Sequence, residues 1–115
     1  MDKNALSNLC KLVSGVIRTG KRGKLSTTEI VILTSVGSAS KPVDMFWLER
    51  VSGVSYASLR ATAGCLNKLA GKNLIEFQMI KVESTILKHV TLTELGHDTL
   101  HVMMTGKKRE GVEYV

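Results

Sequence analysis

A helix that the sequence predicts over residues 58–70 carries small and polar side chains on one face. These are Arg60, Ala61, Gly64, Asn67 and Lys68. The opposite face is apolar, with Leu59, Leu66 and Leu69 at helical spacing. In a major groove, Arg reads guanine edges and Asn reads adenine edges by paired hydrogen bonds. The polar face is therefore suited to enter the major groove of a duplex; the alternative is a solvated face that touches nothing.

The start of the same helix adds three further candidates. Ser55, Tyr56 and Ser58 carry hydroxyl groups that can contact phosphates or base edges. Free backbone N–H groups at a helix N-terminus would help them to bind an anion. With Arg60, Asn67 and Lys68, they make up the candidate recognition-helix site.

Two further groups of basic residues could reach a nucleic-acid backbone. Lys81 and Lys88 flank a predicted hairpin, with His89 nearby, although a hairpin bearing lysines is also an ordinary soluble edge. The densest positive run lies earlier in the chain and comprises Arg18, Lys21, Arg22 and Lys24. It could clamp phosphates, which would steepen the salt dependence of binding, or it could be a solvated loop.

Composition agrees with a polyanionic partner. The chain has 115 residues, a formal net charge of +6 and a pI of about 9.6, a balance that favours nucleic acid or an anionic membrane surface. Hydrophobic residues make up 43% of the chain, enough for one packed domain spanning residues 1–115. No apolar run approaches the length of a membrane span, so we expect no membrane partner and a cytoplasmic protein. The short chain, which has no obvious effector pocket, suits a protein encoded by a bacterium, phage or plasmid.

The elements before the candidate helix are predicted to be helical. Residues 5–17 show a broad apolar stripe, and the glycines and cations of residues 18–24 should interrupt it. Ser26 and Glu29 have the capping-box spacing, which predicts a helix ending near Gly37. Pro42 suits the first turn of a third helix. Its core candidates are Phe46, Trp47, Leu48 and Val51.

The elements after it change period. Apolar and polar residues alternate from Ile75 to Ile80 within the run 73–82, and a second strand-like run covers residues 84–93. Together they predict a β-hairpin with residues 82–84 as its short tip. Thr93 can then cap a last helix. The predicted fold is mainly α with a small β-hairpin (α+β), in the order α-α-α-α-β-β-α, which is the winged helix-turn-helix arrangement.

Two phrases in this segment resemble the winged-helix regulators of the multiple-antibiotic-resistance-regulator (MarR) type. Such proteins end the recognition helix with a phrase like Leu-x-x-Lys-Gly-Leu-Ile and open the helix after the wing with Leu-Thr-x-x-Gly. The matching residues are Leu69, Lys72, Leu74 and Ile75, then Leu92, Thr93, Glu94 and Gly96. Asn73 replaces the usual glycine, a mild change because Asn tolerates the left-handed conformation. The segment before Leu69 is about three residues longer than usual, and the wing lacks the frequent Asp-x-Arg.

The resemblance implies a homodimer on a pseudo-palindromic duplex, with residues 1–20 and 93–106 as dimerisation helices. We expect a sequence-specific DNA-binding transcriptional regulator that represses by occluding a promoter. The alternatives are a DNA-processing accessory protein, acting in plasmid transfer, replication or partition, and a winged-helix module for protein contacts. A small-molecule effector at the terminal helices is left open.

The sequence offers no catalytic site, metal site or cofactor motif, so we expect no enzyme. His97 and His101 lie four residues apart but lack the surroundings of a zinc site, which favours a surface or interface pair. Cys10 is expected to be a buried structural thiol rather than an oxidant sensor, and Cys65 a core residue.

Overall fold

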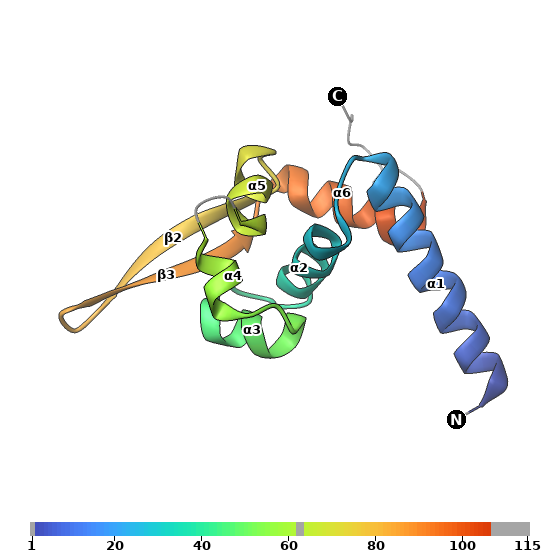
Figure 1. The fold of residues 1–115 in the computed structure, drawn as a ribbon, viewed down its shortest axis with the longest axis horizontal. Helices are drawn as coiled ribbons and strands as arrows, with labels where there is room; N and C mark the ends of the chain where they lie inside the picture. The colour runs from blue at the N-terminus through green and yellow to red at the C-terminus, as the bar shows by residue number, and fades with distance from the viewer. Residues whose placement is uncertain (1, 62–63, 107–115) are drawn as a thin grey trace.

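The computed structural model describes residues 2–61 and 64–106 (Figure 1). It has a mixed α+β winged-helix architecture, which confirms the predicted fold class. The elements, in chain order, are α1 (Lys3–Arg22), α2 (Thr27–Gly37), β1 (Val43–Asp44), α3 (Met45–Ser52), α4 (Tyr56–Arg60), α5 (Cys65–Gly71), β2 (Ile75–Val82), β3 (Thr85–Leu92) and α6 (Glu94–Thr105). Two features of this order were not predicted: strand β1, and the division of the recognition helix into α4 and α5.

The first helix is longer than its apolar pattern indicated. The sequence predicted an interruption at residues 18–24, but α1 continues to Arg22. Gly20 is buried there because its bare Cα packs against the side chain of Ile30 in α2. The helix ends in a Schellman motif, in which the N–H of Leu25 donates to the carbonyl of Gly20 at 3.0 Å and Lys24 takes a left-handed φ of 66°.

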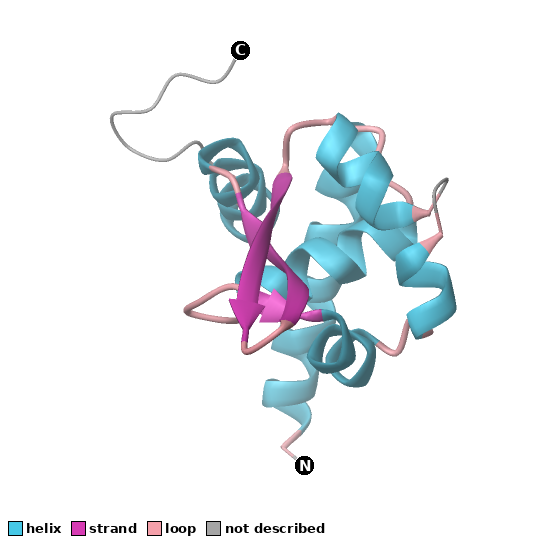
Figure 2. Ribbon diagram, turned by 90° about the vertical axis from the view of Figure 1, so that its left-hand side faces the viewer, coloured by secondary structure: helices cyan, strands magenta, loops and turns pink. Residues whose placement is uncertain are grey.

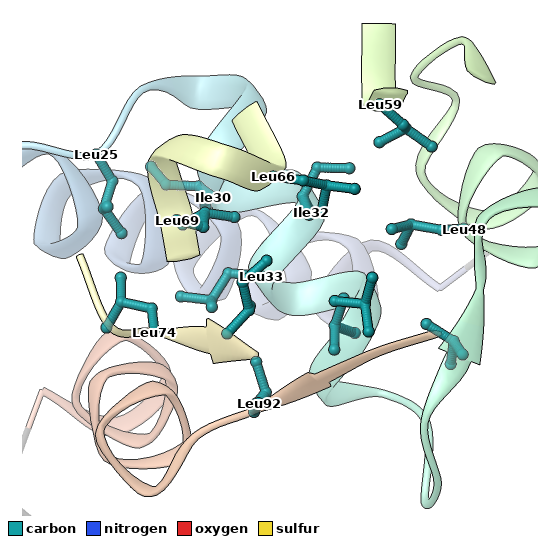
Figure 3. Close-up of a cluster of buried hydrophobic side chains, with 14 of the residues drawn as sticks. Leu25, Ile30, Ile32, Leu33, Leu48, Leu59, Leu66, Leu69, Leu74 and Leu92 are labelled. Carbon is teal, nitrogen blue, oxygen red and sulfur yellow. The ribbon is translucent and has the colours of Figure 1, made fainter. Parts of the chain in front are cut away.

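Helix α2 is the centre of the core. Its predicted capping box is present, since the N–H of Glu29 donates to Ser26 Oγ and the N–H of Ser26 donates to the Glu29 carboxylate, each at 3.1 Å. The buried apolar side chains around α2 come from each of the other described helices and from all three strands of the sheet. Figure 3 shows part of this cluster. Those labelled in the figure are Leu25, Ile30, Ile32, Leu33, Leu48, Leu59, Leu66, Leu69, Leu74 and Leu92.

The segment around Pro42 differs from the prediction. Pro42 does not lie in a helix; it precedes the short strand β1, whose Val43 pairs with Val90 of β3. Helix α3 begins only at Met45, with Asp44 as its N-cap. The inward positions are consequently Met45 and Leu48, three residues apart.

This later start changes which side chains of α3 reach the core. Leu48 is fully buried as predicted, and Trp47 packs partly against the core. Phe46 and Val51, also expected to be buried, are 65% and 50% exposed. Successive residues of a helix point about 100° apart, so Phe46 and Val51 lie off the face that Met45 and Leu48 share.

The hairpin of β2 and β3, here called the wing, is confirmed. Its sheet has the order β1-β3-β2 with antiparallel pairing throughout. The strands are joined at Glu83 and Ser84, with Glu83 at a left-handed φ of 57°. Figure 1 shows the wing extending away from the helices, and Figure 2 views it from its tip. Met79, Val82 and Ile86 in its distal half are accordingly 65%, 49% and 62% exposed.

Candidate nucleic-acid interface

The predicted continuous recognition helix is wrong, because the chain breaks it into α4 and α5. Gly64 is the N-cap of α5, and a Cβ placed on it would lie 2.5 Å from the carbonyl oxygen of Ser58. Only glycine therefore allows α5 to start so close to the end of α4. Thr62 and Ala63, which the sequence placed within the continuous helix, lie outside the described residues.

The anchors of both short helices are nevertheless the leucines that the periodicity selected. Leu59 of α4 is 1% exposed, and Leu66 and Leu69 of α5 are 1% and 0% exposed. Burying three leucines fixes both helices on the core and turns their polar sides outward. Arg60, Asn67 and Lys68 are accordingly all exposed, as expected for the polar face of the predicted helix.

The hydroxyl groups at the start of α4 are already engaged within the chain. Ser55 caps the helix: its Oγ accepts from the N–H of Ser58 at 3.2 Å and donates to Ser58 Oγ at 2.9 Å. The N–H of Tyr56 donates to the carboxylate of Glu49 on α3. These contacts fix the turn between α3 and α4, so the N-terminus of α4 offers fewer free donors than expected.

Four of the predicted site residues line one groove between the helices and the wing. They are Tyr56 and Arg60 from α4, Asn67 from α5 and Lys88 from β3. The groove, here called the recognition groove, has a volume of about 410 Å³, and its floor includes Met45, Leu59 and Leu66. Tyr56 and Lys88, although distant in the sequence, thus line the same groove, and the polar side chains stand around its apolar floor.

Aromatic rings hold the cations of this groove in place. Phe46 stacks on Tyr56 with ring centroids 4.7 Å apart, and the Arg60 guanidinium lies 5.4 Å from the centroid of Tyr56. Lys88 Nζ lies 4.0 Å from the centroid of the Phe77 ring. Cation–π contacts of this kind restrict long flexible side chains while leaving their charge available. Asn67 is oriented in turn by donation from Nδ2 to the carbonyl of Ala61 at 3.2 Å.

The remaining wing candidates are divided between its two faces. Lys81 pairs with Ile86 and Lys88 with Met79, which places both lysines on the face that continues into the core. His89 pairs with Asp44 and Gln78, so it lies on the opposite face and is half-buried. The wing therefore directs its two lysines together and directs His89 elsewhere.

Two other groups of candidate cations lie apart from the groove lining. Lys68 is exposed on α5. Arg18, Lys21 and Arg22 are exposed on the last turns of α1, and Lys24 follows in the corner before α2. The four cations from Arg18 to Lys24 thus lie around the end of α1. None of them lines the recognition groove, which is built from α3, α4, α5 and the wing.

The junction between α5 and β2 is a second Schellman motif. Leu74 N–H donates to the carbonyl of Leu69 and Asn73 N–H to that of Ala70, each at 3.0 Å. Asn73 takes the left-handed conformation expected from the sequence, with φ of 61°. Thr93, the N-cap of α6, donates from Oγ1 to the Asn73 carbonyl at 2.6 Å. The two phrases that resemble the MarR type are thus in direct contact.

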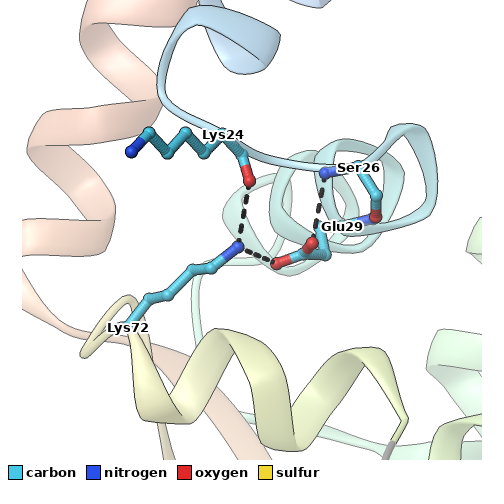
Figure 4. A network of polar contacts seen from close by, with 4 residues as sticks. All are labelled: Lys24, Ser26, Glu29 and Lys72. Atoms are coloured by element: carbon cyan, nitrogen blue, oxygen red, sulfur yellow. Dashed lines mark hydrogen bonds and ion pairs between the residues drawn. The ribbon is translucent and has the colours of Figure 1, made fainter.

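Lys72 connects this junction to the start of α2 (Figure 4). Its Nζ lies 2.8 Å from Glu29 Oε2 and donates to the Lys24 carbonyl at 3.2 Å. Burial acts to raise the pKa of the Glu29 carboxyl, but the hydrogen bonds from Lys72 and Ser26 outweigh it, so this pKa lies below its ordinary value. The ion pair therefore holds the C-terminal end of α5 against α2.

The cysteines and histidines do not form a reactive centre in the described part of the chain. Burial and the nearby Glu29 carboxylate raise the pKa of the Cys65 thiol to about 11, so it stays protonated at neutral pH. Cys10 is exposed on α1, contrary to the expected burial. His97 is exposed and His101 half-buried. Among residues 2–61 and 64–106, no three His, Cys, Asp or Glu side chains gather as metal ligands would.

Sequence reasoning missed the aromatic members of the groove. Phe46 was assigned to the core, and Phe77 was treated only as an alternating strand residue. Their signal was weak, since an exposed aromatic looks the same in a sequence as a buried one. The spacing between Phe46 and Tyr56 becomes meaningful only when the turn between α3 and α4 is known.

An apolar cavity of about 660 Å³ lies on another side of the molecule, between the end of α1, the α5–β2 junction and α6. Leu25, Leu74, Val102 and Met103 contribute its apolar lining, and Arg22, Lys24 and Lys72 contribute cations. It adjoins the terminal helices, where the sequence left a small-molecule effector open. Separately, in the described residues no helix combines the length and apolar character needed to cross a bilayer.

Comparison with known proteins places the fold. No protein-family model and no curated protein sequence matches the chain. Solved structures do: apo MarR from E. coli has a TM-score of 0.64 at 16% identity, covering 93% of this chain and 78% of that one. The transcriptional regulator BldR from Sulfolobus solfataricus has a TM-score of 0.60 at 21% identity, covering 90% and 77%. BpsR from Bordetella bronchiseptica, whose DNA binding is regulated by 6-hydroxynicotinic acid, has a TM-score of 0.60 at 15% identity, covering 88% and 76%. The chain therefore has a MarR-like winged-helix fold.

Proposed function

We propose that the chain is a sequence-specific duplex DNA-binding transcriptional regulator. The observation that carries this proposal is the recognition groove, where Tyr56, Arg60, Asn67 and Lys88 converge from three elements. The fold supports it, because the similar solved structures include a transcriptional regulator and a protein whose DNA binding is regulated. The net charge of +6 supplies the long-range attraction to a polyanion.

In this proposal α5 and the end of α4 enter the major groove. Arg60 and Asn67 supply the donors and acceptors that distinguish base pairs, and Lys68 approaches the backbone. Lys81 and Lys88 of the wing approach the neighbouring phosphates. Arg18, Lys21, Arg22 and Lys24 remain a separate cationic corner, whose contribution would be to the salt dependence rather than to the sequence preference.

We further propose that the regulator is a homodimer formed through the terminal helices. Residues 2–14 of α1 and its cap are exposed along their whole length, and Leu6, Leu9 and Val13 are 53%, 51% and 47% exposed. Met104 of α6 continues this surface, lining an apolar groove with Leu12 and Val13. A second copy would cover both, in the region of residues 1–20 and 93–106.

Selection of bound duplexes from a random pool, followed by titration at several salt concentrations, tests the DNA-binding proposal. We expect a recovered consensus with two half-sites about 10 base pairs apart, as a symmetric dimer requires. Arg60→Ala should weaken binding by about 1–3 kcal/mol and relax the preference at one position. Lys68→Ala should lower the salt slope by about 1. Lys41→Ala, an exposed lysine in the loop before β1 and outside both proposed surfaces, is the matched control.

The position of the selected sites in a genome separates repression from the alternatives. Sites that overlap promoters, with a reporter that rises when Arg60→Ala replaces the wild type, support repression by occlusion. Sites at an origin of replication or transfer would support a DNA-processing accessory protein. Unchanged affinity in Arg60→Ala would contradict the assignment of the groove to DNA and favour a module for protein contacts.

A further inference from the structure

Strand β2 forms an open edge of the sheet. The strand order β1-β3-β2 leaves one side of Ile75–Val82 without a paired strand in the described part of the chain. Its pairing with β3 is one-to-one along the whole strand, so no β-bulge interrupts this edge, and it contains no proline. Native proteins usually protect a long edge with bulges, prolines, charges or a covering element. An edge of this length and regularity indicates a partner strand.

The middle of this edge also lacks charge. The four residues from Phe77 to Ile80 are uncharged, with Glu76 before them and Lys81 after them. Met79, within this uncharged run, is 65% exposed. Uncharged segments of strand-forming residues at an exposed edge associate readily with other strands. The side chains of β2 therefore leave its edge open to pairing.

The turn of the wing determines which backbone groups point outward. Glu83 and Ser84 form a two-residue turn, and Val82 pairs with Thr85 across it. The residues that flank such a turn form a hydrogen-bonded pair, and hydrogen-bonded and non-hydrogen-bonded pairs then alternate along the hairpin. The even-numbered residues of β2 consequently bond to β3, and the odd-numbered ones direct their N–H and C=O groups to the open edge. Beyond the buried Ile75, these outward residues are Phe77, Met79 and Lys81.

We propose that β2 pairs antiparallel with β2 of a second copy of this chain, about a two-fold axis at Met79. Two-fold symmetry in an antiparallel pair places Met79 opposite Met79 of the partner subunit and Phe77 opposite Lys81 of the partner subunit. All three outward residues then exchange backbone hydrogen bonds. The pairing stops before Ile75, which is 2% exposed. The two three-stranded sheets become one continuous sheet.

The side chains of β2 suit this register. Lys88 Nζ already lies 4.0 Å from the centroid of the Phe77 ring, on the side of β3. Lys81 of the partner subunit would flank the same ring from the other side, which adds a cation–π contact across the interface. Glu76 meets the uncharged Val82 of the partner subunit, whereas registers centred on Glu76 or on Lys81 would place like charges directly opposite each other. A second copy therefore supplies a complementary strand.

This pairing would extend the assembly beyond the dimer proposed above. Figure 1 shows the wing and the N-terminal half of α1 on opposite sides of the body, so one copy can use both contacts at once. Dimers joined through their wings would occupy neighbouring duplex sites cooperatively. That consequence rests on the proposed function, whereas the strand pairing itself does not.

The main experiment uses the full chain without DNA. Met79→Lys and Met79→Glu each place two like charges directly opposite one another at the axis. In sedimentation equilibrium, each variant should need a roughly 30-fold higher concentration than the wild type to reach the same average mass. An equimolar mixture of the two variants should recover most of the wild-type association, because an ammonium group then lies opposite a carboxylate.

Ile86→Lys and Ile86→Glu are the matched controls. Ile86 is 62% exposed on the same face of the wing as Met79, but it lies on β3, the inner strand. Both controls should associate as the wild type does. Equal losses in the Ile86 and Met79 variants would show that the face of the wing associates rather than its edge, which would overturn the inference. Circular dichroism checks that these exposed changes leave the fold intact.

Hydrogen exchange measures the backbone contact directly. As the concentration of the wild type rises, the amides of Phe77, Met79 and Lys81 should become protected. The amides of Gln78 and Ile80, which already bond to β3, should not change. A wild type whose mass and outward amides do not respond to concentration would overturn the pairing, and a mixture of Met79 variants that fails to associate would overturn its register. Since DNA is absent, either failure leaves the DNA-binding proposal to its own test.

Discussion

The two surfaces that we propose for DNA and for a second copy are supported in opposite ways. The recognition groove is braced from below: Leu59, Leu66 and Leu69 anchor its helices, and the Lys72–Glu29 ion pair holds the end of α5. The N-terminal half of α1 has no such brace, and Figure 1 shows it projecting from the body. Leu6 and Leu9 in this half of the helix are 53% and 51% exposed.

The difference matches what each partner would demand. A surface that reads base edges needs donors set in fixed positions before the duplex arrives, because positional error costs hydrogen bonds. A surface that meets a second copy of itself needs only complementary apolar area, which the partner can complete. The chain therefore supplies the brace for one surface and leaves the other to be covered.

The largest effect should follow from removing an anchor beneath the recognition groove. Leu69 is fully buried, so Leu69→Ala should cost about 3 kcal/mol in the free energy of unfolding through lost burial and a residual cavity. Urea denaturation followed by circular dichroism measures it. Val51→Ala, at a 50% exposed site on α3 outside the proposed dimer region, should change stability by less than about 0.5 kcal/mol. Equal losses in the two variants would show that Leu69 is no anchor.

The next effect concerns the unbraced surface. Leu9→Ala should weaken dimerisation by about 2 kcal/mol in total, since both copies lose apolar contact at the same interface. Sedimentation equilibrium over a range of concentrations gives the dissociation constant. The far-ultraviolet spectrum should keep its helical signal. A dissociation constant equal to that of the wild type would remove α1 from the interface.

The brace at the end of α5 should be pH-dependent. The folded-state pKa of Glu29 is depressed, so its stabilising contribution is complete above the unfolded value and is lost as the pH falls toward the folded value. Glu29→Gln should cost about 1–2 kcal/mol at pH 7. It should also reduce the stability that the protein loses between pH 5 and pH 3 in urea titrations. If the stability of the variant changed with pH in the same way as that of the wild type, Glu29 would not be a source of the pH dependence.

The smallest effect should come from the corner between α5 and the wing. Asn73→Ala places a Cβ-bearing residue without a local hydrogen-bonding side chain at φ of 61°, and should cost about 1 kcal/mol. Asn73→Gly should be neutral or slightly stabilising, because glycine adopts this conformation freely. Thermal unfolding of the two variants separates the cost of the left-handed backbone conformation from the loss of any side-chain contact of Asn73. A larger loss in Asn73→Gly would mean that the side chain, not the conformation, matters.

Local signals in the sequence predicted the parts of the fold that depend on neighbouring residues. The capping box of Ser26 and Glu29, the left-handed Asn73 and the buried Leu66 and Leu69 each follow from a few adjacent positions. The winged-helix order and the recognition-site face followed from these. The convergence of Arg60, Asn67 and Lys88 was expected only as separate candidates and required the three-dimensional arrangement.

The failures share a dependence on distant residues. Strand β1 exists because Val43 pairs with Val90, which no local pattern around Pro42 reveals. That strand ends at Asp44, the N-cap of α3, so the helix begins later than Pro42 suggested. The break before α5 depends on Gly64 meeting the carbonyl of Ser58, a contact visible only after α4 has folded. Met79 and Ile86, in the distal half of the wing, looked like ordinary strand residues until the structure showed that no layer covers them.

One measurement tests the central contrast most directly. Backbone amide shifts of the full-length protein should be recorded by nuclear magnetic resonance as the selected duplex is added at moderate salt. Our account predicts large perturbations in α4, α5 and the wing, with Leu6 to Val13 of α1 unperturbed beyond the effect of dimerisation. Perturbations confined to α1 or α6, with Arg60, Asn67 and Lys88 unaffected, would contradict it.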